Sequence, residues 1–131
     1  IEMITPIRGM KEQLIHLQNA DCTLGILTSN SEKNVVKFLE RNNMQVFDFI
    51  YSGSSLFGKE KVIRSMLREK KFDPDKVIYV GDEGRDIEAS KKAGVKVAAV
   101  TWGFSSRKGL ETYKPDFLLD TPEELTKLIS Y

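Results

Sequence analysis

The sequence has a single cysteine, Cys22, among its 131 residues, so it cannot form an internal disulfide. This fits a reducing compartment, and we expect a cytoplasmic protein. No run approaches the roughly 18 apolar residues that a membrane-spanning helix needs, and we recognise no secretory signal. Neither sign of charge is in excess, since 20 Lys and Arg face 19 Asp and Glu. We therefore expect neither nucleic acid nor a membrane as a partner.

Apolar residues follow a helical spacing and an extended spacing in alternation along the chain. Helices are expected at 11–19, 31–42, 60–70, 86–93, 106–112 and from 121 on, and strands at 23–27, 47–51, 77–80, 95–100 and 117–119. This alternation predicts an α/β fold with a parallel sheet flanked by helices. Without a repeat or a linker, the chain is expected to form one domain, 1–131. Ligands of such sheets bind at the carboxyl ends of the strands, so the residues after each strand carry the functional information.

Two of these strand ends carry hydroxyl or cationic groups. Thr28, Ser29 and Asn30 come between the first strand and a helix, whose first amide groups can hold a phosphate. Ser and Thr are also ordinary helix caps, so this signal alone is weak. The second strand is followed by a loop rich in Gly and Ser that ends in Lys59, which can neutralise a phosphate. Lys61 competes for the same role, and either lysine can instead be a solvated surface residue.

The third strong strand ends in acidic and glycine residues. Gly81 and Asp82 follow Val80, and Asp86 comes four residues after Asp82. Aspartate is poor strand material, and two carboxylates here suggest a hard cation such as Mg²⁺, which proteins hold with few carboxylates and several waters. The alternative is that Asp86 only caps the helix that follows.

In this order, the signals resemble the motifs of the haloacid dehalogenase superfamily. The family's second motif is an apolar strand that ends in Thr or Ser, as in 24–28, and its third is a lysine at a helix start, matched by Lys59. Its fourth is an apolar strand followed by Gly-Asp and a second Asp four positions on, matched by 80–82 and Asp86. Further similar segments are 87–89, 93–95, 100–104, 115–116 and 122–125. The resemblance covers nearly the whole chain and is closest to the phosphoglycolate phosphatase-like branch.

The resemblance implies a three-layer Rossmann-like core with a mostly parallel sheet, but one motif is absent. The family's first motif, Asp-x-Asp-x-Thr or Val, contains the nucleophile and follows the first strand. The only Asp-x-Asp here, at 73–75, lies in a turn and in the wrong order, so we reject it. We expect the chain to lack the central strand and the cap domain, with 1–9 as the return from the cap and an upstream segment supplying the strand. Two apolar sheet edges would then be open, which favours self-association.

The chemistry that the resemblance implies is Mg²⁺-dependent hydrolysis of a small phosphate monoester through an aspartyl-phosphate. An upstream Asp would attack phosphorus, and Asp82 would help to hold the metal. Lys59 would pair with the phosphate or the nucleophile, and Asp86 would orient Lys59 or a metal-bound water. The groups expected to hold phosphoryl oxygens are Thr28 and the amides of Ser29 and Asn30. The chain on its own is expected to be inactive.

Two departures from the family pattern affect these assignments. Glu83 stands where many relatives have Ser or Thr, and Lys59 lacks the Pro that often follows the motif lysine, which leaves Lys61 open. Other functions also remain open: a non-catalytic binding or regulatory module, or a phosphotransferase or mutase of the same superfamily. A receiver domain would place its acidic pair before the Thr and Lys, and a dinucleotide-binding domain would need a glycine fingerprint that is missing.

Overall fold

The computed structural model describes residues 9–53, 58–103 and 105–129, which form two compact units. The first unit comprises Ile1–Ser54 and Pro122–Tyr131, and the second comprises Ser55–Thr121. Residues 1–8 of the expected return from a cap at 1–9, and residues 54–57 of the Ser-rich loop, lie outside the described residues.

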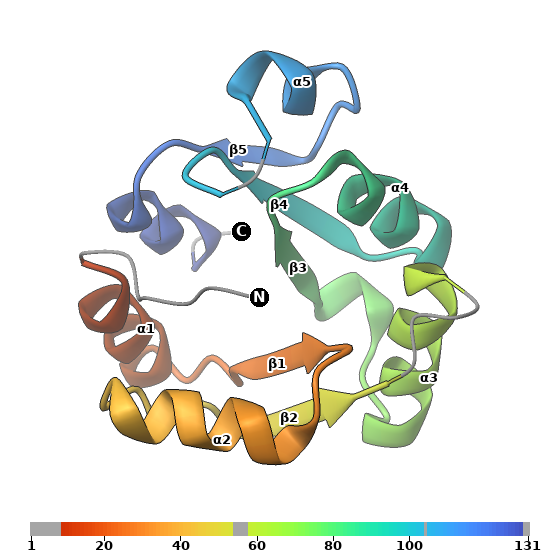
Figure 1. Ribbon diagram of the computed structural model, residues 1–131. Coiled ribbons are helices and arrows are strands. Elements are labelled where there is room, and N and C mark those ends of the chain that lie inside the picture. The colour runs from red at the N-terminus through yellow and green to blue at the C-terminus, as the bar shows by residue number, and fades with distance from the viewer. Residues whose placement is uncertain (1–8, 54–57, 104, 130–131) are drawn as a thin grey trace. The chain divides into compact units, whose positions relative to one another are not determined.

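The first unit is a parallel strand pair with helices packed beside it (Figure 1). The pair consists of β1 (Gly25–Thr28) and β2 (Phe49–Ser52), in a register that sets Thr28 opposite Ser52. The helices are α1 (Met10–Asn19), α2 (Glu32–Arg41) and the 3₁₀ helix η3 (Pro122–Leu128), which packs against α1. The buried apolar residues of the first unit include Met10, Leu17, Leu39, Met44, Val46 and Leu125.

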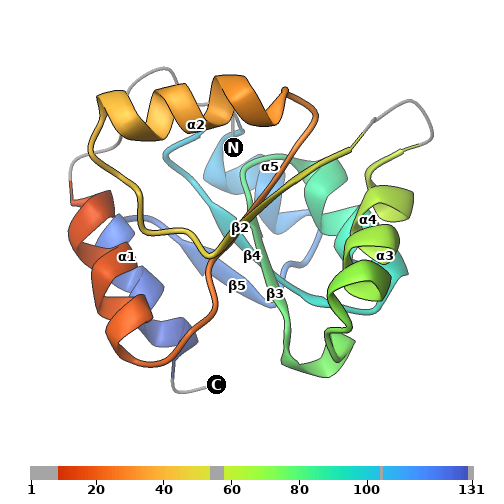
Figure 2. The ribbon, with the colours of Figure 1, turned by 90° about the horizontal axis from the view of Figure 1, so that it is seen from below.

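The second unit is a three-stranded parallel sheet in the order β3-β4-β5. Its elements are α3 (Lys59–Lys70), η2 (Pro74–Lys76), β3 (Ile78–Gly81), α4 (Gly84–Ala93), β4 (Lys96–Val100), α5 (Arg107–Glu111) and β5 (Phe117–Leu119). Figures 1 and 2 both show α3 and α4 side by side, in agreement with their extensive contact. Ile87, Val97, Ala99 and Leu110 form a fully buried cluster, against which Tyr79 and Leu118 pack.

Local side-chain chemistry explains where several helices begin and end. Ser31 caps α2 as expected, since its Oγ accepts the N–H of Asn34 at 3.2 Å. Gly94 ends α4 in a left-handed conformation, with φ of 82°. The first turn of α4 begins at Gly84, two residues before the expected start. The last helix is present, but as a 3₁₀ helix.

The first three strands begin one or two residues later than the apolar runs predicted. Before β1, the N–H of Leu24 donates to Oδ2 of Asp48 at 2.7 Å, and the Asp48 N–H donates to the Leu24 carbonyl. This side-chain link takes the place of a ladder pair, so both strands start after it. Before β3, the N–H of Val77 donates to the carbonyl of Pro74 at 3.3 Å and belongs to the preceding turn.

The α/β class and the parallel pairing of the strands are confirmed. Within the described ranges, β1 and β2 form one sheet and β3 to β5 another, with no described strand that joins β1 to β3. Open parallel sheets flanked by helices agree with a fragment of a Rossmann-like core. Among the helices that the structure describes, none is long and apolar enough to cross a membrane.

Candidate active site

Thr28 ends β1 and shapes the turn into α2. The residue is buried, with 6% of its surface exposed. Its Oγ1 accepts the N–H of Asn30 at 3.0 Å, so the turn folds back on its own hydroxyl group. A phosphoryl oxygen at this turn would compete with Thr28 Oγ1 for the Asn30 N–H.

Asn30 ties the same turn to α2 and to the end of β2. Its Oδ1 accepts the backbone N–H of Ser31 at 3.2 Å and Nδ2 of Asn34 at 3.3 Å. Its carbonyl accepts the hydroxyl of Ser52 at 2.5 Å. The first unit therefore brings Thr28 and Asn30 together and adds Ser52, which was not among the predicted site residues. Ser29 is exposed between them.

In the second unit, Lys59 at the start of α3 pairs with Asp86 at the start of α4. Lys59 Nζ lies 2.5 Å from Asp86 Oδ1. The Asp86 side chain is 3% exposed and that of Lys59 is 28% exposed. Lys61, the alternative lysine, is exposed. The geometry therefore brings Lys59 to the predicted aspartate.

The second oxygen of Asp86 holds the backbone at the end of β3. Oδ2 accepts the N–H of Asp82 at 3.1 Å and that of Glu83, the N-cap of α4, at 3.0 Å. Asp86 therefore caps its helix and pairs with Lys59 at the same time, and both of its oxygens are engaged. Gly81 makes this possible, because a Cβ at position 81 would lie 2.6 Å from Oδ2 of Asp86.

Tyr79, on β3, adds an aromatic surface next to Lys59. Lys59 Nζ lies 5.9 Å from the centre of the Tyr79 ring. Burial acts to lower the pKa of Lys59, but Tyr79 and the Asp86 carboxylate together outweigh it and raise that pKa. Burial, with the charge of Asp86, raises the pKa of the Tyr79 phenol. At neutral pH Lys59 is therefore an ammonium and Tyr79 a neutral phenol.

Asp82 follows β3 directly and is the predicted metal ligand. It is half-buried, and its backbone N–H is fixed by Asp86. No group of three or more His, Cys, Asp or Glu suited to a metal occurs in 9–53, 58–103 and 105–129. Magnesium needs no such cage, because one or two carboxylates, waters and a substrate phosphate are its usual ligands. Asp82 is suited to supply one carboxylate ligand to Mg²⁺, with the remaining ligands from other groups.

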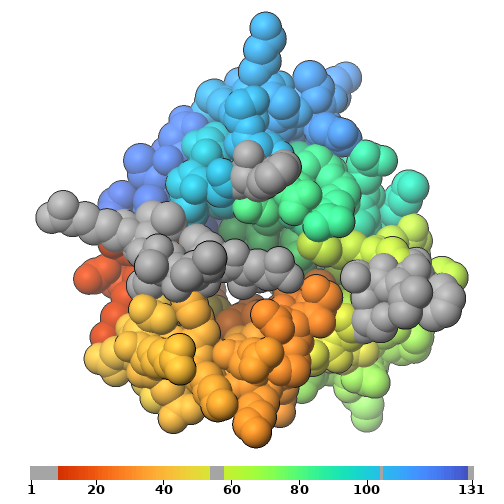
Figure 3. Space-filling view, in the orientation of Figure 1, coloured from red at the N-terminus to blue at the C-terminus, as the bar shows by residue number. Residues whose placement is uncertain are grey.

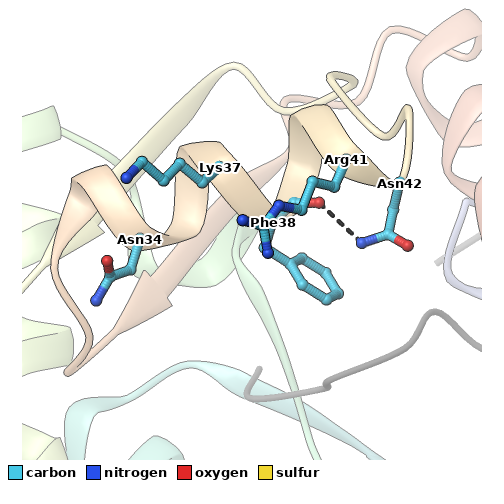
Figure 4. Close-up of a pocket in the computed structure, with 5 residues that line it drawn as sticks. All are labelled: Asn34, Lys37, Phe38, Arg41 and Asn42. Atoms are coloured by element: carbon cyan, nitrogen blue, oxygen red, sulfur yellow. Dashed lines mark hydrogen bonds between the residues drawn. The ribbon is translucent and has the colours of Figure 1, made fainter.

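A surface hollow on the first unit contains none of the predicted site residues. It is lined by Asn34, Lys37, Phe38, Arg41 and Asn42, and Figure 4 shows that all come from α2 and its end. Asn42 Nδ2 donates to the Phe38 carbonyl at 2.8 Å. In Figure 3, where α2 faces the viewer in orange, its side chains lie on the outer surface. One exposed helix face with no convergent group from a second element gives no reason to assign chemistry to this hollow.

The chain is similar to curated proteins that are longer than it is. It is 36% identical over 123 residues to a phosphoglycolate phosphatase of Synechococcus elongatus, covering 93% of this chain and 58% of the relative. It is 28% identical over 133 residues to the pyrophosphatase PpaX of Bacillus anthracis, covering 98% of this chain and 62% of the relative. The chain thus spans about 58–62% of the length of these relatives.

Solved structures and a family sequence model agree with this likeness. A haloacid dehalogenase-like hydrolase from Streptococcus pneumoniae superposes with a TM-score of 0.84 at 25% identity, over 94% of this chain and 59% of that one. The sequence model described as haloacid dehalogenase-like hydrolase matches residues 2–100. The match includes every predicted site residue, from Thr28 to Asp86. The chain therefore belongs to the haloacid dehalogenase-like hydrolase family.

Proposed function

We propose that the intact protein hydrolyses a small phosphate monoester with Mg²⁺, through an aspartyl-phosphate. The observation that supports this most is the Lys59–Asp86 pair beside Asp82 at the carboxyl end of β3. The relative named phosphoglycolate phosphatase favours a small phosphorylated acid as the monoester substrate. The relative named pyrophosphatase suggests an alternative outside the monoesters, the phosphoanhydride pyrophosphate. We keep the cytoplasm as the expected location, because the single cysteine cannot form an internal disulfide.

The residues of the second unit have distinct roles in this proposal. Asp82 supplies one carboxylate to the metal, which when bound offsets the negative charge of the phosphate and the nucleophile. Lys59 binds a phosphoryl oxygen or the nucleophilic carboxylate, and its raised pKa keeps it charged. Asp86 is a positioning residue, because one of its oxygens holds Lys59 and the other holds the Asp82 N–H. Charge stabilisation and positioning supply most of the rate in phosphoryl transfer.

The turn that follows β1 supplies further phosphoryl ligands in this proposal. Thr28 donates its hydroxyl, and the amides of Ser29 and Asn30 complete the set at the start of α2. The Asn30 N–H bonds to Thr28 Oγ1 in the structure, so binding requires an exchange of partners for that group.

The nucleophile in this proposal comes from a segment outside this chain. Asp73 and Asp75 form the only Asp-x-Asp pair in the sequence, and they do not resemble a nucleophile motif in structure either. Both are exposed, and Asp73 Oδ1 accepts the Asp75 N–H at 3.0 Å to cap a 3₁₀ turn. We propose that residues 1–131 form the carboxyl-terminal part of the core, and that the open edges of β1 and β3 favour self-association when the central strand is missing.

Two lysine variants of the intact protein test the proposal. Lys59→Ala is expected to lower the turnover of p-nitrophenyl phosphate by about 100-fold or more, the usual loss when one group that stabilises transition-state charge is removed. Lys61→Ala, its matched control two residues away, is expected to keep full turnover, and EDTA should abolish activity in both the wild type and this control. The reverse pattern in the two lysines would move the role to Lys61.

Product analysis separates the proposal from its rivals. Release of inorganic phosphate from phosphoglycolate or pyrophosphate supports hydrolysis and identifies the substrate class. Transfer of the phosphoryl group to an added sugar phosphate would indicate a mutase or phosphotransferase. Binding without any turnover by the intact protein would indicate a non-catalytic module.

A further inference from the structure

The turn that leaves β4 lies directly against the side chain of Asp82. A Cβ placed on Gly103 would lie 2.7 Å from Cγ of Asp82 and closer still to its Cβ and one carboxylate oxygen. The Cβ of Asp82 does not move when its side chain rotates, so rotation of that side chain alone cannot relieve the clash with a Cβ on residue 103. The φ of Gly103 is not in the left-handed region, so close approach, rather than backbone conformation, is what requires glycine here.

The backbone of Asp82 is held from both sides. Its N–H donates to Oδ2 of Asp86 at 3.1 Å, and its carbonyl accepts the N–H of Ser105 at 3.2 Å. With Gly103 against the side chain, the position of Asp82 is therefore fixed by groups from α4 and from the turn after β4.

The turn itself is fastened at both ends by Asp120, which follows β5. Asp120 Oδ1 accepts the hydroxyl of Thr101 at 3.0 Å, and Oδ2 pairs with Nη1 of Arg107 at 2.5 Å. Thr101 N–H also donates to the carbonyl of Leu119 at 3.0 Å. Asp120 thus joins the residue before the turn to the residue after it.

We propose that Gly103 is a positioning residue that confines the Asp82 carboxylate for the metal, and that Asp120 holds the turn in place for this purpose. The inference rests on the proposed role of Asp82 in Mg²⁺ binding. A preformed carboxylate position improves metal affinity because the site does not have to order it on binding. Gly103 touches neither substrate nor metal and acts through Asp82 alone.

The test is the Mg²⁺ affinity of the intact protein, measured by calorimetry without substrate, together with the melting temperature without metal. Gly103→Ala is expected to weaken Mg²⁺ binding by about 10-fold or more, the range seen for residues that support metal ligands. Gly109→Ala is the matched control on the neighbouring helix, since a Cβ there would lie 3.3 Å from Ser106 Oγ and away from Asp82. It is expected to bind Mg²⁺ like the wild type.

Asp82→Asn separates this inference from the function on which it rests. If Asp82→Asn loses Mg²⁺ and Gly103→Ala binds it normally, the positioning role is wrong and the proposed metal ligand stands. If Asp82→Asn binds Mg²⁺ normally, the proposed metal ligand itself is wrong.

A second variant covers the case in which Gly103→Ala fails to fold. Asp120→Asn loosens the turn without adding an atom near Asp82, and we expect a several-fold loss of Mg²⁺ affinity with a small change in melting temperature. Unchanged affinity in Asp120→Asn would then overturn the inference.

Discussion

At the scale of single residues, Asp86 connects the stability of the second unit with its proposed chemistry. A buried carboxylate is costly unless it is paired and hydrogen-bonded, and this one has an ammonium group on one oxygen and two amides on the other. Loss of Lys59 would leave Asp86 partly uncompensated. We therefore expect Lys59→Ala to lower the free energy of unfolding by about 1–3 kcal/mol as well as reducing turnover.

The pH dependence of unfolding tests this pairing. The pKa of Lys59 is raised in the folded protein. The contribution of Lys59 to the free energy of unfolding is therefore complete at neutral pH and is lost as the pH rises through that pKa. Tyr79 acts in the same direction, because its phenol ionises in the unfolded chain at a lower pH than in the folded one. Urea unfolding should therefore show a fall in stability above about pH 10.

The control for this pH dependence is the same urea unfolding, measured over the same pH range, for Lys59→Ala and Lys61→Ala. The fall should be shallower in Lys59→Ala and unchanged in Lys61→Ala. An equally steep fall in Lys59→Ala would show that other groups cause the alkaline loss.

The sequence indicated the charged residues of the candidate site, but not the side chains that the structure places beside them. Lys59, Asp82 and Asp86 were identified because their order and spacing resemble family motifs. Tyr79 was taken only as part of an apolar strand, and nothing in the linear pattern connects it with Lys59, twenty residues earlier in the chain. Gly103 was part of a similar segment, but the close approach that requires a glycine depends on tertiary packing.

At the scale of elements, α4 packs against α3, β3 and β4, and several of its buried residues are small. Ala89, Ser90 and Ala93 are buried, and Ser90 is 0% exposed. Its Oγ has no hydrogen-bond partner among the residues that the structure describes. A buried hydroxyl without a partner costs free energy. We infer that Ser90 suits this position because its side chain is small, and that its hydroxyl group does not stabilise the fold.

Two serine-to-alanine changes should therefore have different effects on stability. Ser90→Ala removes an unpartnered hydroxyl and is expected to leave the free energy of unfolding unchanged or to raise it by about 1 kcal/mol. Ser106 caps α5, because its Oγ accepts the Gly109 N–H at 3.2 Å. Ser106→Ala removes this cap and is expected to lower the free energy of unfolding by about 1 kcal/mol. Chemical denaturation measures both, and a larger loss for Ser90→Ala than for Ser106→Ala would contradict this account.

The existence and type of the elements were predictable, but several of their boundaries were not. Helices were found from apolar spacing and caps such as Ser31, which are local signals. The starts of β1 and β2 depend on the link between Asp48 and Leu24, residues 24 positions apart in the chain. A contact between residues so far apart in the chain has no local sequence signal. The apolar runs therefore placed the starts of these two strands too early.

At the scale of the whole molecule, the chain contains most of a family core but not its nucleophile motif. The described residues contain parallel strands in two sheets and the helices beside them, and three segments of the sequence resemble family motifs. The alternation of helical and extended segments was sufficient to predict the α/β class and the parallel pairing, because strands joined through helices pair in parallel. Substrate identity was not predictable, since none of the residues matched to the motifs distinguishes one phosphate monoester from another.

The central claim is that hydrolysis requires a nucleophile from outside this chain. The most direct measurement compares the release of p-nitrophenol from p-nitrophenyl phosphate with Mg²⁺ by the 131-residue chain and by the intact protein. We predict no turnover by the chain, turnover by the intact protein, and loss of that turnover in Asp82→Asn. Turnover by the chain alone that disappears in Asp82→Asn would mean that another carboxylate, in this chain or in a partner copy, acts as the nucleophile, and would contradict the account.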